Sequence, residues 1–199
     1  EAEKQIAGQF AALDDIMAYN QYKVLAAFQK NRIRDMHFGW TTGYGYDDAG
    51  RDAIEQVFAD VFHAEAALVR TTFVNGTHAL ATTLLGILRP GDELIYATGE
   101  PYDTLQTVIG ITNYENGSLK DYGITFKQVD LLPDGSIDIE GVKAAITDKT
   151  RMVTAQRATG YSWRKAISID EIAALMKAVQ AVNPSIVKMV DNSYGEFLD

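Results

Sequence analysis

The first group of residues that could do chemistry is Val74-Asn75-Gly76-Thr77-His78-Ala79, which precedes a largely apolar helical pattern. The N-terminus of a helix presents unpaired N–H groups and a partial positive charge, and both attract anions. Gly76 would allow the backbone to approach a phosphate closely, and the Thr77 hydroxyl would add a hydrogen bond. An ordinary N-cap at Asn75 or Thr77, with a structural His78, is the competing interpretation. The segment predicts either a phosphate site or a simple helix cap.

A second candidate is Asp191, which ends the apolar run Ile186-Val187-Lys188-Met189-Val190. A carboxylate at the end of such a strand would lie at the ligand-binding edge of a parallel sheet. There it could keep a pyridine nitrogen protonated, although its position fits a turn-capping role equally well. Tyr194, three residues later, could reach a ring hydroxyl, or it could be an ordinary packed aromatic residue.

The third candidate is Tyr102 in Gly99-Glu100-Pro101-Tyr102-Asp103, directly after another strand pattern. Its ring could stack on a flat ligand, and surface cover is the simpler alternative. A phosphate site, a stacking ring and a carboxylate beside a ring nitrogen are together what bound pyridoxal phosphate (PLP) requires. The three features therefore predict a PLP site.

The elements that must position these residues alternate between helix and strand from Arg51 onward. Such alternation predicts an α/β fold with a mainly parallel sheet between two layers of helices. Ser168 and Glu171 have capping-box spacing, which predicts a helix start. We expect helices near 54–61, 77–88, 102–111, 138–146 and from 168, and strands over 66–74, 93–98, 124–130, 151–156 and 186–191.

Residues 1–50 have a different pattern, with apolar positions between Phe10 and Phe28 at helical spacing and an irregular Gly- and Tyr-rich segment over 38–48. The pattern predicts one or two amphipathic helices that form an arm outside the sheet. We therefore expect an interface arm over 1–50, a ligand-binding domain over 51–199, and oligomerisation through the arm.

Composition excludes several classes of function. A net charge of −9 and a pI near 4.8 disfavour nucleic acid and anionic membranes as partners. The chain has no cysteine, and its three histidines (His37, His63 and His78) lie far apart, so we expect no metal site. We find neither a membrane-spanning run nor a secretory signal, and we expect a cytoplasmic protein.

The sequence resembles the methionine gamma-lyase-like, or aluminium-resistance, proteins, which belong to the fold-type-I PLP enzymes. The resemblance extends over nearly the whole chain from about residue 20. It rests on HFGWTTGYGYDDAGRD (37–52), VNGTHA (74–79), RPGDELIYATGEPYDTL (89–105), GSLKDYGI (117–124), QRATGYSWR (156–164) and VDNSYGEF (190–197).

The resemblance implies the three-layer αβα large domain of the aspartate aminotransferase-like enzymes, in a homodimer or homotetramer with shared active sites. It also implies roles for ten residues. They are the phosphate-binding turn (Gly76, Thr77, His78), the stacking and catalytic Tyr102, the nitrogen partner Asp191, the ring-hydroxyl partner Tyr194, the partner-subunit residues Tyr44 and Tyr46, and two candidates for binding a substrate carboxylate, Arg157 and Arg164.

The implied activity is cleavage of carbon–sulfur bonds in amino acids, as in methionine gamma-lyase or cystathionine beta-lyase. The Schiff-base lysine of the family lies downstream of the Asp191 strand, and Lys188 lies within it, so we expect the chain to be the cofactor-binding half of a longer enzyme. A non-catalytic binding or assembly protein with this fold is one alternative. A dinucleotide-binding oxidoreductase is another, although after Gly43-Tyr44-Gly45 the third glycine falls at 50 instead of 48.

Overall fold

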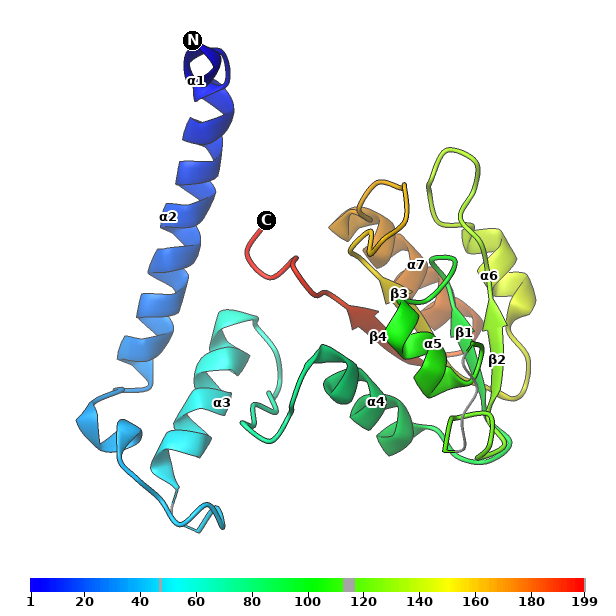
Figure 1. Ribbon diagram of the computed structural model, residues 1–199, viewed down its shortest axis with the longest axis horizontal. Coiled ribbons are helices and arrows are strands. Elements are labelled where there is room, and N and C mark those ends of the chain that lie inside the picture. The colour runs from blue at the N-terminus through cyan, green and yellow to red at the C-terminus, as the bar shows by residue number, and fades with distance from the viewer. Residues whose placement is uncertain (47, 113–116, 199) are drawn as a thin grey trace. The chain divides into compact units, whose positions relative to one another are not determined.

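The computed structural model describes residues 1–46, 48–112 and 117–198, and its elements are labelled in Figure 1. The chain divides into two compact units. The arm unit comprises Glu1–Phe73 and Phe197–Asp199, and the sheet unit comprises Val74–Glu196. The domain boundary that we expect after residue 50 stays a prediction, since the units defined by contacts divide after residue 73.

The arm unit is helical, as its apolar spacing predicts. Its elements are α1 (Ala2–Gln5), α2 (Ala7–Lys30), the 3-10 helix η1 (Asp35–Phe38) and α3 (Ala49–Val61). The single helix α2 occupies the region where the sequence allows one or two. A small core of Ala27, Val57 and Val61 joins α2 to α3, which explains why α3 groups with the arm. No helix in the described part of the chain is long and apolar enough to cross a bilayer.

In the residues that the structure describes, the sheet unit alternates helix and strand, and its four strands are all parallel in the order β2-β1-β3-β4. Its elements are α4 (Gly76–Ile87), β1 (Glu93–Tyr96), α5 (Asp103–Ile109), β2 (Thr125–Gln128), α6 (Ile139–Ala145), β3 (Thr150–Gln156), α7 (Ile169–Val182) and β4 (Val187–Asp191). The register pairs Gln156 with Asp191, so the last residues of β3 and β4 lie side by side. The predicted α/β fold with a parallel sheet is confirmed.

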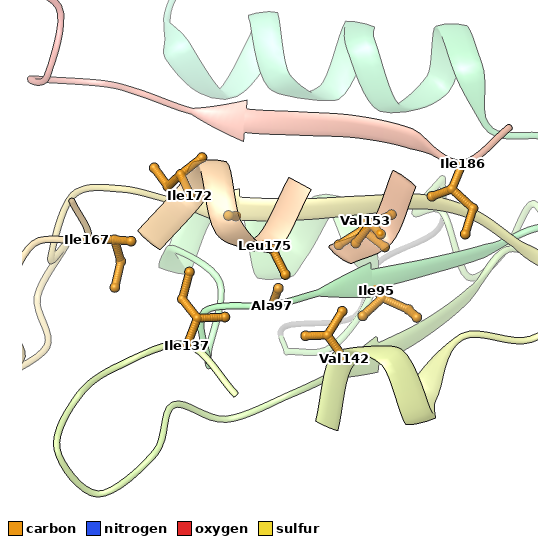
Figure 2. Close-up of a cluster of buried hydrophobic side chains, with 11 residues drawn as sticks. Ile95, Ala97, Ile137, Val142, Val153, Ile167, Ile172, Leu175 and Ile186 are labelled. Carbon is orange, nitrogen blue, oxygen red and sulfur yellow. The ribbon is translucent and has the colours of Figure 1, made fainter. Parts of the chain in front are cut away.

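Helices cover both faces of the sheet. Side chains alternate between the two faces along each strand, so each strand packs against both helical layers. Leu94 and Tyr96 of β1 pack with apolar residues of α4 and α5. The intervening Ile95, together with Ala97, packs on the opposite face with residues of α6 and α7. Figure 2 shows this second cluster, in which Leu175 of α7 faces the strands. The resulting three layers are those expected from the sequence.

The strand predicted over 66–74 is wrong, because this segment forms turns and irregular chain. The N–H of Val69 donates to Oε1 of Glu55 at 2.9 Å instead of to a neighbouring strand. Arg70 pairs with the same carboxylate. Leu68 and Val74 are 63% and 80% exposed, so the apolar run is not buried as a central strand would be. A short apolar run cannot by itself distinguish a buried strand from other apolar segments.

Candidate functional site

The carboxyl edge of the sheet contains a cavity of about 220 Å³ within the sheet unit. The N-terminus of α4 and the segments that follow β1, β3 and β4 form its wall. Its lining residues are Gly76, Thr77, Leu80, Tyr102, Gln156, Ala158, Gly160, Asp191, Ser193 and Tyr194. Five residues predicted to bind the cofactor therefore meet in one place, at the edge where parallel sheets bind ligands.

The N-terminus of α4 contributes an anion-binding end to this cavity. Asn75 is the N-cap, because its Oδ1 accepts the N–H of His78 at 2.9 Å. Among the described residues, the main-chain N–H groups of Gly76 and Thr77 donate to no protein acceptor. A Cβ added at Gly76 would meet no atom within 4 Å, so a ligand can approach the backbone. The cap and the anion site are therefore compatible, and the Thr77 hydroxyl lies 2.6 Å from that of Thr104.

His78 lies in the same turn but is not among the residues that line the cavity. Its Nδ1 accepts the N–H of Val74 at 3.2 Å, which supports the conformation of the turn. Its predicted contact with a phosphate stays a prediction.

Gln156 is a central residue of the site that the sequence reasoning missed. Its Oε1 accepts the hydroxyl of Tyr96 at 3.0 Å and the main-chain N–H of Tyr102 at 3.1 Å. Its Nε2 donates to the carbonyl of Ala158 at 3.1 Å. Burial, assisted by the negative charge of Asp191, raises the pKa of Tyr96 far above its usual value, which keeps that hydroxyl a donor. Gln156 therefore joins three segments of the cavity wall.

The ring of Tyr102 stacks on that of Tyr161, with centroids 5.6 Å apart and planes 25° from parallel. The hydroxyl of Tyr102 donates to that of Tyr161 at 3.4 Å. This hydrogen bond favours the neutral phenol and, with the charge of Tyr161, raises the pKa of Tyr102 to about 12. Both rings also line a second cavity of about 290 Å³, which shares Tyr102, Gln156 and Gly160 with the first.

Asp191 is the last residue of β4, and Tyr194 lies in the turn that follows it. One carboxylate oxygen of Asp191 accepts the N–H of Ser193 at 3.1 Å, as a turn-capping residue would. Tyr194 has a φ of 71°, a left-handed conformation that is uncommon for residues other than glycine. Its side chain is 86% exposed. Both residues nevertheless border the cavity, so the turn-capping and ligand-binding roles do not exclude each other.

The two arginines predicted to bind a substrate carboxylate hold loops in this structure. The buried guanidinium of Arg157 donates to Oδ1 of Asn192 at 3.2 Å and to the carbonyl of Gly195 at 2.9 Å. Arg164 donates to the carbonyl of Gln156 at 3.1 Å, and burial lowers its pKa. Neither arginine lines the cavity, and their contact with substrate stays a prediction.

Tyr44 and Tyr46 belong to the arm unit and are 81% and 82% exposed. Their placement in the site of a partner subunit stays a prediction. The neighbouring Gly43 and Gly45 both have φ of 79°, in an irregular segment that follows η1 and no described strand. A dinucleotide-binding turn must connect a strand to a helix, so the geometry gives this alternative no support.

Comparison with known proteins identifies close relatives of the chain. A family model described as methionine gamma-lyase matches residues 1–199. The Bacillus subtilis (strain 168) protein YnbB, itself called uncharacterized, is 46% identical over 100% of the chain and 48% of its own length. A carbon-sulfur lyase involved in aluminium resistance from Clostridium novyi NT is 48% identical. The match covers 100% of this chain and 47% of that one, with a TM-score of 0.94.

A third relative, from Listeria monocytogenes, is provisionally named a cystathionine beta-lyase involved in aluminium resistance. It is 48% identical, with a TM-score of 0.95 over 99% of this chain and 49% of that one. The chain therefore spans about half the length of these relatives.

Proposed function

The chain belongs to the methionine gamma-lyase family, and on that premise we propose that it is the cofactor-binding half of a PLP-dependent carbon–sulfur lyase. One observation carries the proposal. The N-terminus of α4 at Gly76 and Thr77, the ring of Tyr102 and the carboxylate of Asp191 line one cavity. A small amino acid that contains sulfur is the proposed substrate.

The groups in the cavity fit the chemistry of this cofactor. The N–H groups of Gly76 and Thr77, with the open space above Gly76, suit a phosphate ester. The ring of Tyr102 has one face covered by Tyr161, which leaves the other face for a flat ligand. The carboxylate of Asp191 suits a protonated ring nitrogen. None of the described residues that line the cavity is a lysine or an arginine, so the helix end is the cationic feature that this wall offers a phosphate.

When bound, the cofactor supplies an electron sink for the negative charge that develops on the substrate's Cα. The residues of the chain then have separate tasks. Asp191 holds the proton on the ring nitrogen, Gly76 and Thr77 fix the phosphate, and Leu80 contributes apolar surface that excludes water. Tyr102 holds a proton on its phenolic oxygen and delivers it to the departing sulfur atom.

The proposal extends to the complete protein. It assigns the Schiff-base lysine to a position downstream of β4, and Tyr44 and Tyr46 to the site of a partner subunit in a homodimer or homotetramer. The lyase names of the Clostridium novyi and Listeria monocytogenes relatives share the cleavage of a carbon–sulfur bond, and this is the reaction class that we propose.

The test compares Asp191→Asn with the unchanged complete protein, both supplied with PLP. We expect a loss of kcat/KM on the order of 100-fold, because a preorganised charge beside the reacting system is removed. Release of thiol and keto acid from methionine, homocysteine, cystathionine and cysteine measures activity, and visible absorbance measures cofactor binding. Asp148→Asn is the control, because Asp148 is exposed and precedes β3 at the opposite edge of the sheet. Near-normal turnover of Asp191→Asn would contradict the proposal.

A further inference from the structure

The loop between β3 and α7 places a second tyrosine against the site. Tyr161 is 82% exposed, yet its ring stacks on Tyr102 and its hydroxyl accepts the hydrogen bond from the Tyr102 hydroxyl. Neither the family resemblance nor the motif spacing assigns Tyr161 a role. Its two contacts with Tyr102 differ in kind, because the stacking involves the ring faces and the hydrogen bond involves the hydroxyl groups.

The backbone around Tyr161 is built for this close approach. Gly160 has a φ of 60°, and an added Cβ would lie 3.5 Å from Cδ2 of Tyr102 and 3.1 Å from Nε2 of Gln156. The latter distance is tight enough that Gln156 would have to move. The main-chain N–H of Tyr102 is held by Gln156 at the same time. Tyr102 is therefore fixed at its backbone, at one ring face and at its hydroxyl.

We propose that Tyr161 is a positioning residue for Tyr102, which it holds with its ring plane and its hydroxyl oriented for proton donation. This inference rests on the proposed function, because it concerns the residue that would protonate the departing sulfur. Tyr161 does not line the first cavity, so it acts through Tyr102 instead of touching the substrate.

The electrostatic environment of Tyr102 also favours its protonated form. Its hydrogen bond to Tyr161 comes first among the causes that raise its pKa to about 12, and Asp103 and Tyr194 contribute smaller effects of the same sign. Glu100 lines the second cavity with it and is also an acid. At neutral pH Tyr102 is therefore a proton donor and not a base. The proton leaves its phenolic oxygen for the sulfur that keeps the electron pair of the broken carbon–sulfur bond, and water restores it.

The first test measures the titration of Tyr102 directly, without turnover. The complete protein is labelled with ¹³C at the Cζ atoms of tyrosine, and the Tyr102 resonance is assigned with Tyr102→Phe. In Tyr161→Phe, which keeps the ring and removes the hydroxyl, we expect the midpoint to fall from about 12 toward the ordinary value of about 10. Tyr122→Phe removes another partly exposed phenol and should leave the midpoint unchanged. An unchanged midpoint in Tyr161→Phe would overturn the inference.

The second test uses the pH profile of kcat/KM. In Tyr161→Phe we expect the alkaline limb of this profile to move to lower pH. In Tyr161→Leu, which also loses the stacking, we expect a lower maximum of kcat/KM than in Tyr161→Phe. A limb at the same pH in Tyr161→Phe would refute the positioning role. If the complete protein cleaves none of the substrates, the proposed function fails, while the titration still decides whether Tyr161 controls Tyr102.

Discussion

Replacing Gln156 with leucine would remove the residue that joins three segments of the candidate site. Gln156 is 5% exposed, and its side-chain amide makes hydrogen bonds to Tyr96, Tyr102 and Ala158. Leucine fills a similar volume but offers no acceptor. The hydroxyl of Tyr96, a residue that is 1% exposed, would then be buried without a partner.

The cost of Gln156→Leu follows from what each partner loses. A buried hydroxyl left without an acceptor costs about 1–3 kcal/mol, and each of the other two bonds contributes about 1 kcal/mol. We therefore expect a loss of about 3–5 kcal/mol in the free energy of unfolding. Tyr96→Phe alone should cost only about 1 kcal/mol, because Oε1 of Gln156 still accepts the N–H of Tyr102.

The double variant separates this explanation from a general packing defect. In Tyr96→Phe with Gln156→Leu, no unpaired hydroxyl remains, so its cost should fall short of the sum of the single variants by about 1–2 kcal/mol. Urea-induced unfolding of the complete protein, followed by circular dichroism, measures all three variants. Costs that add within about 0.5 kcal/mol would show that the two side chains do not interact, and the reasoning would be refuted.

Two further predictions concern stability elsewhere in the chain. Burial alone would raise the pKa of Glu93, but hydrogen bonds from Thr150, Lys127 and Thr147 outweigh burial and lower the pKa. The ionised Glu93 therefore stabilises the fold above the unfolded-state pKa, and this stabilisation is lost as the pH falls through the folded-state pKa. Glu93→Gln should lower the free energy of unfolding by about 1.5–3 kcal/mol at neutral pH and make stability depend less on pH on the acid side. The control Glu140→Gln changes a side chain that is 81% exposed and should cost at most about 0.5 kcal/mol in the same urea titration. Gly160→Ala should destabilise the fold by about 1–2 kcal/mol, because the backbone of Gly160 is left-handed. Gly8→Ala, in open space on α2, should stabilise the fold by about 0.5–1 kcal/mol. Equal effects of the two substitutions would rule out the backbone explanation.

Much of the sheet unit could be predicted because its signals are local. Leu94 to Ala97 is a short apolar run between a turn and a Gly-Glu-Pro segment, and it is buried on both faces as a central parallel strand should be. Ser168 and Glu171 form the reciprocal capping box that their spacing predicts. Asp191 could be placed at the ligand edge because it ends an apolar strand.

The parts that could not be predicted depend on tertiary contacts. Gln156 also ends a buried strand at the ligand edge, so the argument used for Asp191 would have found its position. Its role, however, depends on Tyr96 and Tyr102, which are distant in the sequence. The stacking of Tyr161 depends on the path of the loop at Gly160, which no local pattern encodes. The strand predicted over 66–74 was wrong for a similar reason, because the side chain of Glu55 in α3 accepts the hydrogen bond from the N–H of Val69.

The parallel sheet has a practical consequence for experiments on this protein. The groups that line the candidate cavity lie at the carboxyl edge of the sheet, whereas the turns where strands begin lie at the opposite edge. The chain also contains no cysteine. A single cysteine at Asp148 or Lys149, both exposed just before β3, would therefore accept a fluorophore or a surface tether as the unique thiol of this chain. Cofactor uptake could then be followed on immobilised protein without a label near the binding groups.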